Sequence, residues 1–90
     1  MDIVKTKIPK IIGVKPIGQL SLLVMYENKD MKKFDVKPYL EQFSAFAPLA
    51  DERVFNQVRT NGLGTALIWN SEIDISGYDV WEAGISRTNI

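Results

Sequence analysis

The sequence predicts a small α+β domain, in which an antiparallel sheet of about four to five strands carries two or three short helices packed on one face. The chain has 90 residues, of which 46% are hydrophobic and 24% are charged, and these values are typical of one compact domain. Apolar residues in the first half recur with the period of a strand. Signals for helix starts follow in the second half, at Asp51 and Ser76.

The first two strands follow an extended lead-in at residues 1–9. The β-branched residues within 11–14 indicate a short strand, and the Pro-Ile-Gly at 16–18 indicates the turn that ends it. Residues 20–26, LSLLVMY, form the clearest strand of the chain. Because apolar side chains occupy both of its faces, we expect this strand to be central in the sheet.

A hairpin and a short helix come next. The polar residues 27–30 predict a turn, and residues 31–36 predict the strand that returns antiparallel to the previous one. Phe34 and Val36 share one face of that strand, so we expect both to point at the core. A proline then predicts the first turn of a short helix over residues 38–42.

The middle of the chain predicts a loop, a helix and a further strand. Residues 44–48 indicate the loop. Asp51 is a suitable N-cap, and the apolar stripe that follows it predicts a helix that continues to about Arg59. Two glycines place a turn at residues 61–64, and residues 65–69 predict a buried strand that ends in a tryptophan.

The last predicted helix begins after a polar turn. Ser76 and Asp79 have the spacing of a capping box, which predicts a short helix through Ala83. Gly84 suits a left-handed residue after the helix, and residues 85–90 predict a frayed tail. The predicted core consists of Val14, Leu22, Val24, Phe34, Leu40, Leu49, Phe55, Val58, Ile68 and Trp69.

The chain lacks histidine and cysteine, which removes the usual general base near neutral pH, the usual thiol nucleophile and most transition-metal ligands. Asn70, Glu72 and Asp74 have the spacing of the first ligands in a calcium loop. Such a loop also needs a glycine at its sixth position and a carboxylate at its twelfth, and these positions hold Ile75 and Trp81. We therefore predict neither a metal site nor a cofactor, and we assign Asp74 and Ser76 to hydrogen bonds within the turn.

Paired carboxylates are the remaining route to acid–base chemistry, with Asp74 and Asp79 or Glu72 and Glu82 as the candidate pairs. A glycosidase-type pair needs a cleft lined by binding groups, and a chain of 90 residues leaves little room for a deep one. The glycines at 61–64 precede no helix, so they do not form a phosphate-binding loop. The sequence thus predicts a protein that is not an enzyme, with carboxylate- or lysine-based activity as the alternative.

Charge is balanced overall but unevenly distributed. Residues 1–45 hold eight lysines against five acidic residues, a balance of +3, whereas residues 46–90 hold three arginines against six acidic residues, a balance of −3. Spaced lysines are typical of a solvated strand face, or alternatively of a weak basic patch for an acidic partner. The absence of cysteine and of an apolar signal segment predicts a cytoplasmic protein that does not contact the membrane.

Six segments resemble, in order and spacing, the bacterial domain-of-unknown-function family 2442 (DUF2442) over roughly residues 9–84. They are PKIIGVKPI, LSLLVMYENKD, FDVKPYL, LADERVFNQV, IWNSEIDIS and WEAG. The family hairpin usually has a glycine in its turn, where this chain has Asn28, Lys29 and Asp30. The resemblance implies a small α+β fold without an established activity. Some members carry an added helix-turn-helix domain, and related genes often lie beside another small gene in the manner of a toxin–antitoxin pair.

These observations predict one domain over residues 1–90 that acts as a non-catalytic protein-interaction module. The resemblance implies in addition that this module is one half of a toxin–antitoxin-like gene pair. The partner is another protein or a second copy of the chain, bound through a sheet edge or through the helix that carries Trp81. The alternative is a regulatory accessory that contacts nucleic acid directly or through a partner, with direct contact the less expected route. The predicted partner-contact residues are Trp81, Tyr78, Glu82, Lys32 and Lys33.

Overall fold

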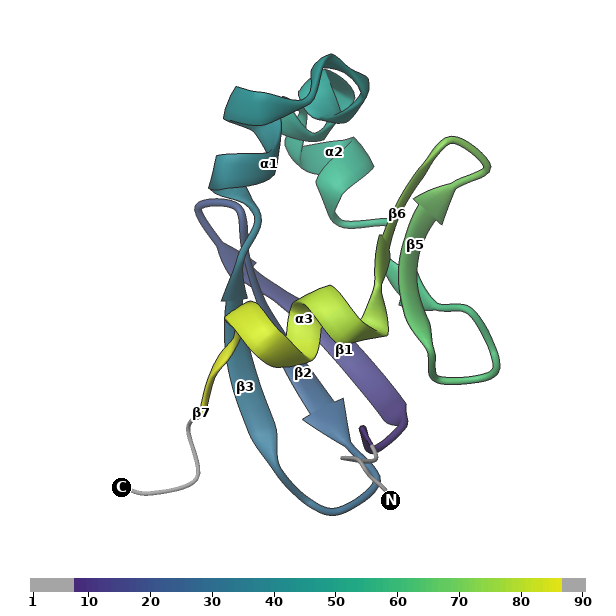
Figure 1. The fold of residues 1–90 in the computed structure, drawn as a ribbon. Coiled ribbons are helices and arrows are strands. Elements are labelled where there is room, and N and C mark those ends of the chain that lie inside the picture. Colours follow the sequence, from purple (N-terminus) through teal and green to yellow (C-terminus); the bar gives the residue numbers. More distant parts are fainter. Residues whose placement is uncertain (1–7, 87–90) are drawn as a thin grey trace, which may run out of the picture.

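The computed structural model describes residues 8–86 and has the predicted α+β architecture (Figure 1). The predictions for residues 1–7 and 87–90 lie outside the described residues. The elements are β1 (Ile11–Gly18), β2 (Ser21–Tyr26), β3 (Met31–Asp35), α1 (Lys37–Gln42), the 3₁₀ helix η1 (Ser44–Ala50), α2 (Glu52–Phe55), β4 (Arg59–Thr60), β5 (Ala66–Asn70), β6 (Ile73–Ser76), α3 (Gly77–Ala83) and β7 (Ile85–Ser86).

The strands form two antiparallel sheets instead of the single sheet expected. The larger sheet has four strands in the order β1-β2-β3-β7, which agrees with the predicted size and places β2 inside the sheet as predicted. A second sheet has the order β4-β5-β6. Two backbone hydrogen bonds connect the smaller sheet to its surroundings, from the Ile11 amide to the Gly64 carbonyl at 2.9 Å and from the Gly77 amide to the Thr65 carbonyl at 2.7 Å.

The strand β1 is longer than predicted, because it continues through Pro16 to Gly18. Proline lacks an amide hydrogen but is tolerated on an edge strand, and β1 is the edge of its sheet. The turn therefore comes after residues 16–18, where it was predicted, and includes Gln19 and Leu20, which have φ angles of 52° and 63°. In the next turn Lys29 supplies the positive φ, 75°, that a glycine usually provides.

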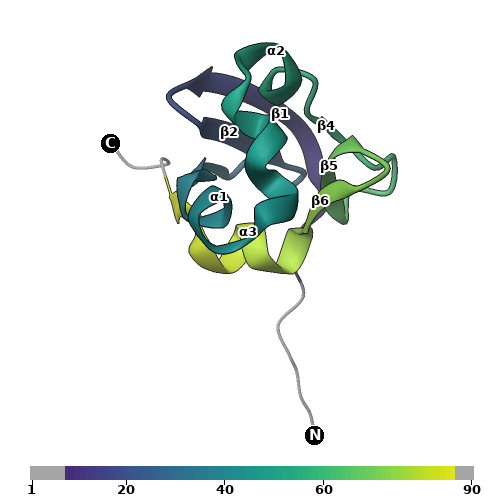
Figure 2. The same cartoon turned by 90° about the horizontal axis from the view of Figure 1, so that it is seen from above.

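The core lies on the inner face of the four-stranded sheet, against which α3 packs (Figures 1 and 2). Leu22, Val24 and Phe34 are fully buried there, as predicted. The prediction of Ile68 was wrong, since Leu67 is fully buried and Ile68 lies on the opposite face of β5. The buried core residues are Ile11, Leu22, Val24, Tyr26, Phe34, Val36, Leu49, Phe55, Leu67, Trp69, Ile73, Ile75 and Val80, and the predicted Val14, Leu40 and Val58 pack against them half-buried.

The helix after Asp51 is much shorter than predicted. Asp51 caps it, since its side chain accepts a hydrogen bond from the Arg53 amide at 2.9 Å, but the helix ends at Phe55. The Trp69 indole donates to the Phe55 carbonyl at 3.0 Å, and Arg59 enters a strand that pairs with β5. Tertiary contacts thus override the helical pattern of the sequence. The predicted loop at 44–48 is also wrong, because these residues belong to η1.

The segment between Trp69 and the last helix contains a strand that the sequence analysis missed. Asn70 closes a tight turn by accepting hydrogen bonds from the Glu72 and Ile73 amides at 2.8 and 3.1 Å. In β6, Ile73 and Ile75 are buried whereas Asp74 is exposed, which is the alternation of a half-buried strand. Asn70, not Asp74, therefore makes the bonds of this turn.

The last helix has the predicted cap and extent. The Ser76 hydroxyl accepts from the Tyr78 and Asp79 amides at 3.0 and 3.4 Å. The left-handed conformation predicted for Gly84 is wrong, because its φ is −71°. A Cβ on Gly84 would lie 2.8 Å from the Val80 carbonyl and 3.1 Å from Lys32 Cβ, so close approach explains this glycine. The predicted frayed tail is wrong for residues 85–86, which form β7.

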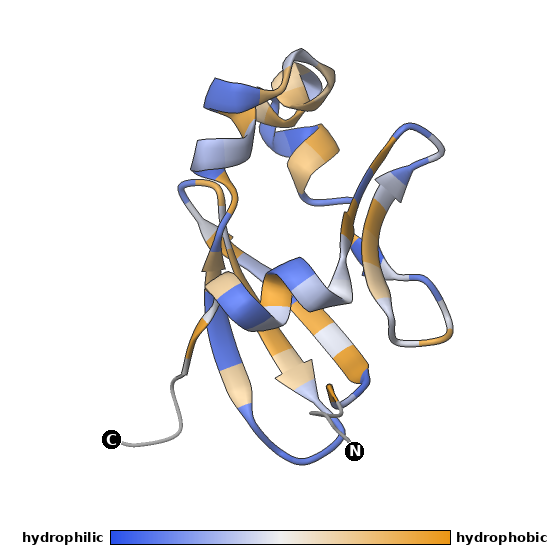
Figure 3. Cartoon of the chain, in the orientation of Figure 1, coloured by the Kyte–Doolittle hydropathy of each residue, from blue (hydrophilic) through white to orange (hydrophobic). Residues whose placement is uncertain are grey.

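Hydropathy follows this arrangement in Figure 3, where the β2–β3 connection is hydrophilic and the middle of β5 is hydrophobic. Within residues 8–86, each helix is too short or too polar to cross a membrane.

Candidate interaction surfaces

The predicted partner-contact residues are divided between the two faces of the four-stranded sheet. Lys32 lies on the inner side, where its Nζ donates to the Trp81 carbonyl at 2.6 Å and stands 3.9 Å from the centre of the Trp81 ring. Trp81 also packs edge-on against Tyr26, with ring centres 5.0 Å apart. Lys32 and Trp81 therefore hold α3 against the sheet, and we call Tyr26, Lys32 and Trp81 the Trp81 cluster.

Two further predicted residues remain accessible on α3. Tyr78 keeps 59% of its surface exposed, and Glu82 is also exposed. The structure leaves both available to a partner. Neither makes a side-chain hydrogen bond or ion pair with another of the residues 8–86.

Lys33 points to the other side of the sheet, which we call the outer face. Strand pairing places Lys15, Leu23, Lys33 and Ile85 in one row across β1, β2, β3 and β7. Residues opposite one another in neighbouring strands share a face, so these side chains form a stripe of two lysines and two apolar residues. The outer face consists of Lys15, Ile17, Ser21, Leu23, Met25, Met31, Lys33, Asp35 and Ile85.

The apolar members of the outer face stay in contact with solvent. The exposed fractions are 41% for Ile17, 37% for Met31 and 69% for Ile85. In the next row Met25 lies opposite Gly13, and a Cβ on Gly13 would stand 2.9 Å from the Met25 methyl group. The glycine thus lets the methionine side chain lie flat across β1, which extends the apolar surface.

A second exposed aromatic group lies beside α1. The rings of Tyr39, Phe43 and Phe46 have centres 5.4 to 6.1 Å apart, and Phe43 keeps 49% of its surface exposed. Burial raises the pKa of Tyr39, and the negative charge of Asp79 raises it further. Asp79 lines the same surface hollow as Tyr39 and Phe43, which places its carboxylate beside the rings.

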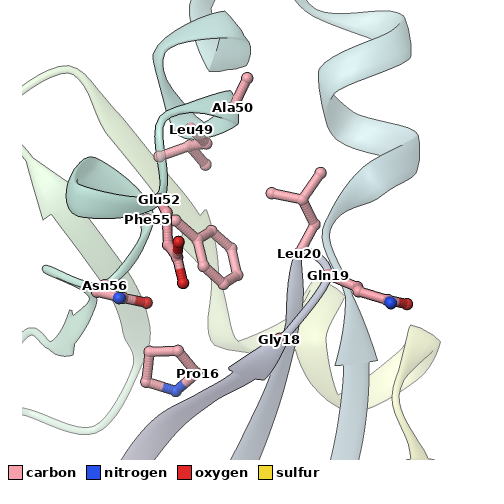
Figure 4. A pocket seen from close by; sticks show the side chains of 9 residues that line it. All are labelled: Pro16, Gly18, Gln19, Leu20, Leu49, Ala50, Glu52, Phe55 and Asn56. Atoms are coloured by element: carbon pink, nitrogen blue, oxygen red, sulfur yellow. The ribbon is translucent and has the colours of Figure 1, made fainter.

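A hollow with a volume of about 410 Å³ lies between the β1–β2 turn and α2 (Figure 4). We call it the hairpin cleft; it is lined by Pro16, Gly18, Gln19, Leu20, Leu49, Ala50, Glu52, Phe55 and Asn56. Figure 4 shows Leu20 facing Leu49 across the cleft, with the Glu52 carboxylate near Phe55. The sequence did not predict this site, because its walls come from segments more than 25 residues apart in the chain. The order of residues does not show that these two segments lie side by side in the fold.

Two of the residues considered as metal ligands, Asn70 and Asp74, lie in the β5–β6 hairpin. The Asn70 amide oxygen is occupied by the β5–β6 turn, and Asp74 stands on the exposed side of β6. Within residues 8–86, no three carboxylates gather in a way that could hold a metal ion.

Comparison with known proteins identifies the family. The family described as "Protein of unknown function (DUF2442)" matches residues 11–85, which is most of the chain and agrees with the resemblance of its segments. No curated protein and no solved structure matches the chain. Because the match covers both sheets and all the helices, the chain belongs to the DUF2442 family.

Proposed function

We propose that this domain is a non-catalytic protein-interaction module that binds its partner through the outer face. The observation that supports the proposal is the set of exposed apolar side chains, Ile17, Met31 and Ile85, on a sheet face that carries two lysines and one aspartate. An isolated exposed apolar residue needs no explanation, whereas a group on one face is typical of an interaction site.

The chemistry of the outer face favours a partner with apolar side chains and carboxylates. Lys15 and Lys33 flank Leu23 in the central row, so each could pair with an acid while the apolar residues between them are buried. The partner is another protein, such as the product of an adjacent gene in a toxin–antitoxin-like pair, or a second copy of the chain. We prefer a protein to a nucleic acid, because Lys32 is engaged by Trp81 and leaves a sparser basic surface.

Site-specific photo-crosslinking tests this proposal. A photoreactive amino acid replaces Met31 or Ile85 in the full chain, and the same group replaces Leu63 as a control. Leu63 is 70% exposed but stands on the loop before β5, away from the outer face. We expect one defined crosslinked species in cells from positions 31 and 85 and none from position 63, and mass spectrometry would identify the partner or show a second copy.

A charge variant supplies the second measurement. Lys33→Glu should lower the yield of the crosslink at Ile85 severalfold, since it places a like charge against an acidic partner. Crosslinks of equal yield from all three positions would contradict a specific face, and so would a strictly monomeric protein without a crosslinked partner. Crosslinking to nucleic acid alone would replace the proposal with the accessory role.

A further inference from the structure

The hairpin cleft joins an apolar floor to polar side chains that the fold does not use. Leu49 is fully buried and Phe55 is 3% exposed, so they form a fixed floor, while Leu20 provides the facing wall. Glu52 and Asn56 stand at the mouth. Neither side chain forms a hydrogen bond or an ion pair with another residue among residues 8–86. A cleft of about 410 Å³ lies within the usual range for small-ligand sites, about 300–1,000 Å³.

From this geometry we propose that the hairpin cleft binds an arginine side chain presented by an extended peptide. The aliphatic stem of arginine would lie along the partly exposed Leu20 and Pro16, and its guanidinium group would reach the Glu52 carboxylate. The planar guanidinium donates in several directions at once, so it can also donate to the side-chain oxygen of Asn56. Arginine combines these two properties, an apolar stem and a forked cationic end, in one side chain.

The lining distinguishes arginine from other ligands by charge. Glu52 is the single ionisable residue of the cleft, and the lining contains no lysine or arginine that could neutralise it. The nearby Arg53 is directed to Asp51, whose carboxylate lies 3.4 Å from its guanidinium. An anionic ligand would therefore meet an unpaired carboxylate, whereas a cation would find its partner in place.

The turn that forms the wall carries backbone strain. Gln19 and Leu20 both have positive φ angles, a conformation that side chains with a Cβ disfavour. The Leu20 carbonyl accepts from the Val36 amide at 2.8 Å, and this bond ties the turn to the residue that precedes α1. The wall is thus prepared before a ligand arrives, which lowers the cost of ordering on binding.

The cleft lies on the inner side of the four-stranded sheet, since Pro16 pairs with the buried Leu22. The outer face is on the opposite side. This inference therefore stands apart from the proposed function, and the two can fail separately.

Nuclear magnetic resonance titration of the isotope-labelled full chain tests the inference. The probe is a five-residue peptide, acetyl-Ala-Ala-Arg-Ala-Ala-amide, and the matched probe carries citrulline, which has the same shape without the charge. With the arginine peptide we expect saturable chemical-shift changes at the amides of Gln19, Leu20, Glu52 and Asn56. The citrulline peptide should bind with an affinity at least about fivefold lower. Ethylguanidine distinguishes a small guanidinium compound from a peptide.

Three variants give three different expected results. Glu52→Gln should weaken binding by about fivefold, the upper range for an exposed ion pair, whereas Glu72→Gln on the β5–β6 turn should leave it unchanged. Asn56→Asp adds a second carboxylate of the same shape and should strengthen binding severalfold. Equal affinity for the arginine and citrulline peptides, shifts located elsewhere, or an Asn56→Asp variant that binds no tighter would overturn the inference. Ethylguanidine binding as tightly as the peptide would overturn the assignment to a peptide.

Discussion

The junction between the two sheets depends on Gly64, and a matched pair of glycine variants can measure this dependence. Gly62 and Gly64 stand in one loop, with φ angles of 84° and 75°. A Cβ on Gly62 would meet nothing within 4 Å. A Cβ on Gly64 would stand 2.8 Å from the Ile11 carbonyl oxygen and 2.8 Å from Lys10 Cβ. Replacing each glycine by alanine therefore imposes a similar backbone cost but a steric cost at only one site.

The magnitudes can be worked out from these contacts. A left-handed alanine costs about 1–2 kcal/mol, and the smaller entropy of the unfolded chain returns about 0.4–1 kcal/mol, so Gly62→Ala should lose about 1 kcal/mol of folding free energy. Gly64→Ala adds overpacking against backbone, about 1–3 kcal/mol. It also strains the hydrogen bond from the Ile11 amide to the Gly64 carbonyl, which contributes about 1 kcal/mol. We expect a total loss of about 3–5 kcal/mol for Gly64→Ala.

Urea unfolding followed by tryptophan fluorescence provides the assay, because the buried Trp69 reports on the smaller sheet. With an m-value near 1 kcal/mol/M, as small domains show, the two midpoints should differ by at least about 2 M. The m-values should agree, so that the midpoints compare the same transition. If the two variants lost free energies of unfolding within about 0.5 kcal/mol of one another, the reasoning would be refuted, since the contact of Gly64 with β1 would then not contribute to stability.

Three further predictions concern single side chains. Burial raises the pKa of Tyr26 from 10.0 to about 12, so between these pH values the folded protein keeps the phenol proton that the unfolded chain loses. The contribution of Tyr26 to the free energy of unfolding should therefore be fully present below pH 10 and decline between about pH 10 and 12. Tyr26→Phe should flatten that decline in alkaline urea titrations, and it should leave the neutral stability equal or higher by about 1 kcal/mol, because the buried hydroxyl has no partner among residues 8–86. Lys32→Met should cost about 1–2 kcal/mol in thermal unfolding through loss of the hydrogen bond and ring contact to Trp81, whereas a similar effect of Lys33→Met would count against it. Gln19→Asn should raise the melting temperature by about 2–5 °C, because asparagine tolerates the positive φ at this exposed turn better, and a lowered melting temperature would contradict the assignment of strain.

The first half of the chain could be predicted from its sequence because its contacts are local. Residues 20–36 form a hairpin whose alternation directly fixes the buried side chains, and Phe34 and Val36 are buried as expected. The caps at Asp51 and Ser76 could also be predicted, since a capping side chain bonds to amides two or three residues away. Such features need no information about distant segments.

The second half depends on distant contacts that the pattern does not contain. The helix after Asp51 ends early because β5 contributes both a strand partner for Arg59 and a donor to the Phe55 carbonyl. The strand β6 was missed because Ile73 and Ile75 are only two apolar residues in a polar segment, and their burial depends on pairing with β5. Propensity is a weak prior where tertiary packing decides.

The candidate surfaces also depend on contacts between distant segments, which the sequence pattern does not contain. Lys32 and Lys33 are adjacent in sequence and were predicted to share a partner, but the period of a strand sends them to opposite faces. Lys32 then becomes part of the packing of α3, and Lys33 joins a stripe with Lys15 that no sequence spacing connects. Most ionisable side chains of this domain are solvated or bonded within turns. The residues that indicate a candidate binding surface are therefore those that the fold leaves exposed next to one another. The outer face and the hairpin cleft are two such groups on opposite sides of one sheet, so the two proposals place their ligands where neither would block the other.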